Sequence, residues 1–175
     1  RVISLTFDAS RSDDSINEIL RILSKYNIKV TFFVTSEWAE RCFDSIGILN
    51  KYGHEIMNAS NNNSSMTDLF KDKAIKKINS ANDIIQSETG VRPILFRPSD
   101  GKYDDNLLET VYALDMLPIG WDVDSNDING LDAKGIVKRV VDETSSGSII
   151  RFNVDGEHTV DALPAIIESF KEKEY

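Results

Sequence analysis

Short β-type runs alternate with longer helical runs along the chain, and this alternation constrains the fold more than any other feature of the sequence. β-branched and aromatic runs predict strands at residues 2–7, 28–34, 54–57, 94–96, 116–120 and 148–152. Apolar residues at helical spacing predict helices at residues 12–26, 38–52, 71–90, 106–114, 133–144 and 161–173. This order favours an α/β fold in which helices cover a parallel sheet, either as an open doubly wound sheet or as a barrel.

Composition narrows the class of protein. A length of 175 residues suits one sizeable core, so we expect a single domain over residues 1–175. The formal net charge of −9 argues against nucleic acid as a partner, because two polyanions repel each other. No apolar run reaches the ~20 residues of a membrane helix, so we expect no membrane contact by this domain. No leader precedes Arg1, and the chain enters a strand almost at once, an abrupt start that suggests a domain cut from a longer precursor. The single Cys42 excludes an internal disulfide.

Polar residues gather just after the ends of the predicted strands. Asp8 ends the first strand, Arg97 follows the fourth and Asn153 follows the last. In a parallel sheet these ends meet at one rim, where they could supply a general base, a cation that orients it and oxygen ligands for a hard metal. The alternative is that Asp and Asn after strands only form turns and helix caps. Because Asn58 and the acidic run at 122–127 extend the pattern to five strand ends, we favour the functional interpretation.

Six ordered blocks carry a family resemblance. They include Thr-Phe-Asp, Gly-His-Glu-Ile, Phe-Arg-Pro and Trp-Asp-Val-Asp-Ser-Asn-Asp, and they lie at residues 2–10, 29–35, 53–56, 96–98, 121–127 and 147–150. These blocks resemble the polysaccharide deacetylase domain, also called carbohydrate esterase family 4 or the NodB homology domain, and its sporulation-associated branch in particular. The resemblance implies a distorted (β/α) barrel. It also implies metal-dependent hydrolysis of N-acetyl groups, through a non-peptide C–N bond, on N-acetylglucosamine polymers such as peptidoglycan or chitin.

The positions that hold the metal in this family are altered. The resemblance assigns the catalytic base to Asp8 and the three metal-ligand positions to Ala9, Ala59 and Asn63. Relatives place one carboxylate and two histidines there and use a divalent metal such as zinc or cobalt. A methyl group cannot bind a metal, and a lone amide oxygen binds it weakly. Losing all three ligands removes the Lewis acid and the activated water, so we expect no metal and no other cofactor here.

The other catalytic positions are partly retained. The resemblance makes Arg97 the residue that orients the base and Asp127 the residue that orients the general acid. Asn153 stands where the family has the general-acid histidine. An amide has no proton to donate at neutral pH, so the leaving amine would depart unaided.

The substrate groove follows the third motif, and the residues that the resemblance places there are Asp100, Gly101 and Tyr103. Relatives carry an aromatic residue at the position of Asp100. Trp38 and Trp121 are single aromatic residues, which we interpret as part of the core and not as a platform for a ligand.

The two histidines do not rebuild the site. His54 is expected to be packed and hydrogen-bonded, and His158 to lie on the surface. Arg151 interrupts the last predicted strand at a position that is usually apolar in relatives. Our hypothesis is that its guanidinium pairs with Asp8 or Asp127 across the vacated metal site.

Taken together, the substitutions predict an inactive or very weak deacetylase-like domain with a glycan-binding or scaffolding role. Its partner would be an N-acetylglucosamine-containing polysaccharide, and the resemblance implies an extracellular, cell-envelope or spore location. Two alternatives stay open. One is a protein-interaction module, and the other is an active deacetylase or esterase with an all-oxygen metal site built from Asp13, Asp14, Asp100 and Asp155.

Overall fold

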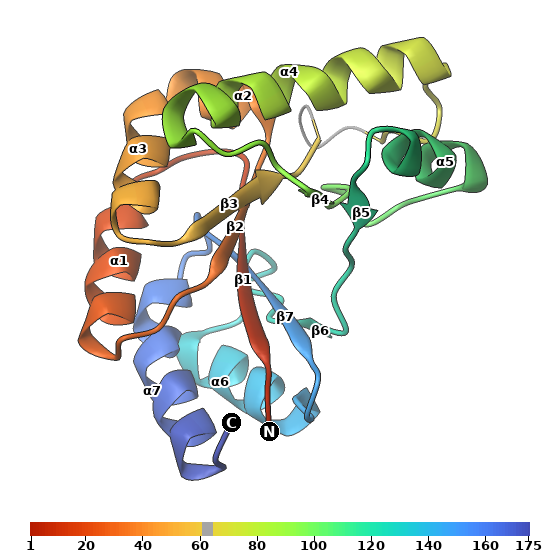
Figure 1. Ribbon diagram of the computed structural model, residues 1–175. Helices are drawn as coiled ribbons and strands as arrows, with labels where there is room; N and C mark the ends of the chain where they lie inside the picture. The colour runs from red at the N-terminus through yellow and green to blue at the C-terminus, as the bar shows by residue number, and fades with distance from the viewer. Residues whose placement is uncertain (61–64) are drawn as a thin grey trace.

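The computed structural model describes residues 1–60 and 65–175, and within them one parallel sheet organises the chain. Its strand order is β5-β4-β3-β2-β1-β7-β6. The strands are β1 (Ser4–Ala9), β2 (Thr31–Val34), β3 (Glu55–Asn58), β4 (Leu95–Phe96), β5 (Leu117–Pro118), β6 (Val123–Asp124) and β7 (Ile149–Asn153). The sheet curls into a half-barrel (Figure 1). The expected distorted (β/α) barrel is thereby confirmed, and the open doubly wound alternative is wrong.

Helices lie outside the curled sheet, where each buries one apolar face (Figure 1). They are α1 (Ile16–Lys25), α2 (Ser36–Arg41), α3 (Phe43–Lys51), α4 (Lys71–Thr89), α5 (Asp105–Ala113), α6 (Ala133–Glu143) and α7 (Thr159–Glu172). The two chain ends lie side by side, and Arg1 donates a hydrogen bond to the carbonyl oxygen of Lys173 at 3.1 Å. In the described part of the chain, no helix combines the length and the apolar character needed to cross a membrane.

The core forms around the two central strands. Phe7 of β1 is paired in register with Phe32 of β2 and Phe152 of β7, so the three rings share one face of the sheet. The ring centroids of both pairs are 5.3 Å apart. Each ring is fully buried, which contributes roughly 2–3 kcal/mol per side chain to the stability of this layer. Trp38 is also fully buried, as the sequence predicted.

The register of the central strands brings polar residues to the opposite face. Asp8 lies beside Asn153 of β7 and beside Phe33 of β2, and Thr6 lies beside Arg151. Side chains alternate between the two faces of a strand, so these residues point away from the phenylalanine layer and toward the inside of the half-barrel. The carboxyl ends of β1 and β7 therefore meet there, as expected from the sequence.

Two features of the chain differ from the sequence expectations. β6 (Val123–Asp124) was missed, because a two-residue strand shows no periodicity. The helix predicted at 38–52 is two helices, α2 and α3, which meet at Cys42. Cys42 has φ −113° and ψ 39°, outside the helical range, and no Gly or Pro marks this break in the sequence.

His54 occupies the packed position that the sequence predicted. It is buried, it meets the ring of Phe32 edge-on at 5.5 Å, and its Nδ1 accepts a hydrogen bond from the backbone N–H of Val30 at 3.3 Å. Burial, helped by the charge of Lys29, lowers the pKa of His54 from 6.5 to about 4. The folded protein therefore holds this imidazole neutral.

This shift predicts a pH-dependent loss of stability. Because the folded-state pKa lies below the unfolded one, the stabilisation is fully present above about pH 6.5 and is lost as the pH falls toward about 4. We expect urea unfolding to show a loss of roughly 2–3 kcal/mol over this range that His54→Asn removes, because asparagine does not titrate. The variant His158→Asn, at a half-buried position, is the matched control and should keep the loss. Identical acid profiles for the two variants would contradict the assignment.

Candidate functional site

Asp8 is the centre of the polar rim, and both of its carboxylate oxygens are engaged by guanidinium groups. Arg97 Nη1 donates to Oδ1 at 2.9 Å, and Arg151 Nε donates to Oδ2 at 2.8 Å. Asp8 is only 6% exposed. Both oxygens of this buried carboxylate therefore accept charge-assisted hydrogen bonds.

Arg97 is fully buried and reaches across the interior of the half-barrel. Besides Asp8, its guanidinium donates to Thr6 Oγ1 at 2.9 Å and to the carbonyl oxygens of Ile119 and Gly120 at 3.4 and 3.1 Å. Burial lowers the pKa of Arg97, and Asp8 opposes that shift. Because the pKa of a guanidinium ordinarily lies far above neutral pH, Arg97 stays charged there. The pairing that the resemblance implied between Arg97 and Asp8 is present.

Arg151 forms the ion pair with Asp8 that the sequence hypothesis gave as one of its two alternatives. It pairs with Asp8, but its second carboxylate is Asp124, 3.3 Å from Nη1, and not Asp127. Asp124 lies directly opposite Arg151 in the β6–β7 register. The guanidinium carbon of Arg151 also lies 4.3 Å from the ring centroid of Trp121, and that of Arg97 lies 5.4 Å from it. Trp121 is therefore held by two cations.

Asp127 and Asn153 form a second buried pair. Asp127 accepts hydrogen bonds from the backbone N–H and side-chain amide of Asn153, at 2.8 and 2.7 Å, and from the hydroxyl of Thr159 at 2.5 Å. A Cβ atom built on Gly156 would lie 2.7 Å from an oxygen of Asp127, so only glycine fits there without a shift. The amide of Asn153 thus donates to Asp127, the same acceptor that the N–H of a histidine at this position would use.

Two of the three positions that match the family's metal ligands, Ala9 and Ala59, line a nearly filled cavity. Asp8, Ala9, Ala59, Asn153 and Arg151 line it, and its volume is about 10 Å³, which leaves space for roughly one water molecule. Asn63 lies outside the described residues. The cavity is also lined by Phe33 and by the neutral hydroxyl groups of Ser10, Thr35 and Ser99. One carboxylate with two guanidinium partners, an amide and neutral hydroxyls do not fit a divalent metal, which needs several anionic or imidazole donors.

The alternative all-oxygen site finds no support in the structure. In residues 1–60 and 65–175, no three His, Cys, Asp or Glu side chains gather in a way that could hold a metal ion. Asp13 accepts a hydrogen bond from Ser45 at 2.6 Å. Asp100 and Asp155 do share a small polar pocket of about 150 Å³, but Arg11 and Arg151 line the same pocket.

A larger pocket lies beside Trp121. Its volume is about 340 Å³, and its walls include Gly101, Tyr103, Trp121, Pro98, Leu108 and Pro118. Gly101 and Tyr103 were predicted to line the substrate groove, whereas Asp100 faces the smaller polar pocket. The interpretation of Trp121 as a core residue is wrong, because the half-buried ring lines this pocket. Gly101 has φ +71°, and a Cβ there would lie 2.8 Å from the Trp121 ring, so glycine permits the close approach.

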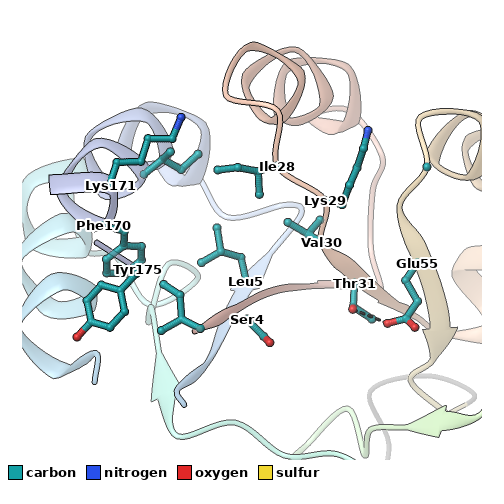
Figure 2. A pocket seen from close by; sticks show the side chains of 13 residues that line it. Ser4, Leu5, Ile28, Lys29, Val30, Thr31, Glu55, Phe170, Lys171 and Tyr175 are labelled. Carbon is teal, nitrogen blue, oxygen red and sulfur yellow. Dashed lines mark hydrogen bonds between the residues drawn. The ribbon is translucent and has the colours of Figure 1, made fainter. Parts of the chain in front are cut away.

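A pocket of about 420 Å³, larger than the one beside Trp121, lies at the other end of the sheet (Figure 2). It is formed at the amino-terminal ends of β1, β2 and β3 and by the end of α7, with Leu5, Val30 and Phe170 among its apolar walls. At its edge the hydroxyl of Thr31 donates to Glu55 at 2.6 Å, and Figure 2 draws this bond. Parallel α/β folds place their chemistry at the carboxyl ends of the strands, so the candidate site is the opposite rim.

The fold is a parallel half-barrel, and a buried carboxylate and a buried arginine lie at the carboxyl ends of its strands. The protein is therefore a barrel-type α/β domain with a candidate site at that rim. Within that class, the family model described as polysaccharide deacetylase matches residues 1–119. The chain therefore belongs to the polysaccharide deacetylase family, whose members generally use a divalent metal.

Similar proteins from bacilli cover nearly all of this chain. It is 33% identical to the peptidoglycan-N-acetylmuramic acid deacetylase PdaC of Bacillus subtilis, over 100% of this chain and 37% of that protein. It is 29% identical to a peptidoglycan-N-acetylglucosamine deacetylase of Bacillus cereus, over 98% of this chain and 64% of that protein. The chain thus spans less than two thirds of either curated relative.

Among solved structures, the chain is similar to a mutant of BA3943, a CE4 family pseudoenzyme of Bacillus anthracis, with restored enzymatic activity. The TM-score is 0.96 at 25% identity, over 99% of this chain and 64% of that one. The fold of this chain is therefore also the fold of a pseudoenzyme whose enzymatic activity was restored in a mutant.

The buried pair makes a stability prediction. We expect Arg97→Met to lower the free energy of unfolding by about 3–5 kcal/mol. The substitution removes one of the two ion-pair partners of Asp8 and the hydrogen-bond donor of Thr6 and of the Gly120 carbonyl. Arg92→Met is the matched control, because the 2.8 Å pair of Arg92 with Asp83 is largely exposed and contributes less than about 1 kcal/mol. Urea denaturation measures both. Equal losses in the two variants would contradict a structural role for the Asp8–Arg97 pair.

Proposed function

We propose that this chain is a catalytically silent, or very weakly active, polysaccharide deacetylase domain that binds a glycan containing N-acetylglucosamine. The observation that carries the proposal is the Asp8 carboxylate, held on both oxygens by arginine beside a cavity of about 10 Å³ where the family would hold a metal. A general base takes a proton from water through one of its oxygens. In this arrangement each oxygen of Asp8 already accepts a hydrogen bond from an arginine, so a water molecule would have to share an oxygen with a guanidinium, and Asn153 cannot serve as the general acid.

The pocket beside Trp121 supports a retained glycan site. Its volume of about 340 Å³ falls in the range of ligand pockets, which are usually walled by apolar and aromatic groups. Tyr103 is 67% exposed, and Trp121 is fixed by the two arginines, so two aromatic faces are available to stack on sugar rings. The named peptidoglycan deacetylases among the relatives favour a cell-envelope glycan, as peptidoglycan or chitin-like chains, and a location outside the cytoplasm.

Loss of chemistry is tested by metal content and acetate release. We expect the purified protein to carry far less than one equivalent of divalent metal. With added Zn²⁺, Co²⁺ or Mn²⁺, it should release no acetate from chitin oligomers or peptidoglycan above background, because it lacks the metal ligands and the general acid. The Bacillus subtilis relative PdaC, assayed in parallel, shows whether each substrate is competent. Metal-stimulated release that Asp8→Asn abolishes would overturn the proposed loss of activity.

Glycan binding is tested by titrating chitin oligomers and peptidoglycan fragments, followed by NMR. We expect shifts at the rim, and about fivefold weaker binding for Tyr103→Ala, because one stacking contact contributes on the order of 1 kcal/mol. Tyr112→Ala is the matched control, since Tyr112 is also exposed but lies outside the pocket. No shifts at the rim with either glycan would favour the protein-interaction alternative.

A further inference from the structure

Arg151 lies where a strand of a parallel half-barrel would ordinarily present a small or uncharged side chain. In the register of β1 and β7 it is the neighbour of Thr6, two residues before Asn153, so its side chain points inside the half-barrel. Only 14% of that side chain is exposed. A buried guanidinium is retained in a fold only when anions surround it.

The surroundings of Arg151 supply those anions. Its Nε is 2.8 Å from Asp8 and its Nη1 is 3.3 Å from Asp124, while the ring of Trp121 covers the guanidinium at 4.3 Å. Together with Arg97, this gives two cations and two carboxylates, so the cluster of Asp8, Arg97, Asp124 and Arg151 is neutral as a whole. No added cation is required to balance it.

The position of Arg151 also determines what else can enter. It lines the same cavity of about 10 Å³ as Asp8, Ala9 and Ala59. A divalent ion placed there would meet a positive charge a few ångströms away, in surroundings where like charges repel much more strongly than in water. The ion would also have to displace Arg151 from Asp8, the carboxylate that the buried guanidinium needs as a partner.

We infer that Arg151 is an internal cation that takes over the electrostatic role of the family's divalent metal and excludes that metal from the rim. This inference rests on the proposed loss of the metal, and it goes further by making Arg151 a barrier in its own right. Restoring ligands is then not sufficient for metal binding while the guanidinium stays in place.

The test uses a double variant, Ala9→Asp/Ala59→His, that restores two metal ligands at positions lining the described cavity. It compares the metal affinity of this variant with and without the guanidinium of Arg151. Zn²⁺ and Co²⁺ are titrated by calorimetry into this double variant, with Arg151 retained and with Arg151→Met. We expect at least about tenfold tighter binding once the guanidinium is removed, because a like charge no longer opposes the ion. Arg92→Met in the same background is the control and should leave the affinity unchanged.

Two more variants separate charge from bulk and guard against misfolding. Arg151→Lys keeps the charge and should bind metal no better than the arginine background. Arg151→Gln removes the charge but keeps a hydrogen-bond donor for Asp8, so it replaces Arg151→Met if circular dichroism shows that methionine unfolds the protein.

Each outcome has a distinct meaning. Equal affinities with arginine, methionine and glutamine at position 151, or no binding in any of them, would overturn the inference and leave the proposed function standing. Tight stoichiometric binding by the unmodified protein would overturn the proposed loss of metal itself.

Discussion

The geometry of the half-barrel depends on one buried charge pair. Arg97 follows β4, whereas its partners Thr6 and Asp8 lie on β1, with β3 and β2 between those strands in the sheet. A side chain can bridge that separation only through the interior of a curled sheet. A fully buried guanidinium without its acceptors is strongly destabilising, so the pair favours the curled arrangement over a flat one. The same contact fixes where Asp8 points and thereby sets the geometry of the rim.

The substitutions at the rim share one property, which is that none of them leaves a buried charge or polar group without a partner. Removing a metal from a buried site leaves carboxylates without a counter-ion, and removing imidazoles leaves their neighbours without hydrogen-bond donors. Small apolar residues at positions 9 and 59 leave no unpaired polar group behind. Asn153 still donates to Asp127, and Arg151 restores positive charge beside Asp8. Under the proposed function, the fold is kept because each lost interaction has a neutral or compensating replacement.

The sequence predicted the part of this site that follows from strand order, and less of what depends on loop conformation. Asp8, Arg97 and Asn153 end adjacent or nearby strands, so their convergence could be expected from the α/β alternation. The second partner of Arg151 could not, because Asp124 is placed opposite Arg151 by β6, a strand of two residues with no periodic signal. The role of Trp121 was missed for a related reason. It follows Gly120 in an irregular segment, where its ring is placed by the positive φ of Gly101 and by two guanidinium groups.

The charge of the molecule is a poor guide to what the rim can bind. The chain as a whole carries −9, yet the cluster of Asp8, Arg97, Asp124 and Arg151 balances two cations against two anions. Its charged groups already satisfy one another, so their attraction for an incoming ion is small. The surface still available for contact is the aromatic wall formed by Tyr103 and Trp121. A neutral ring can pack against this wall without removing water from a charged group. A neutral sugar face therefore suits this rim better than an ion does, and Arg151 contributes to that preference by neutralising Asp8 while it supports the ring of Trp121.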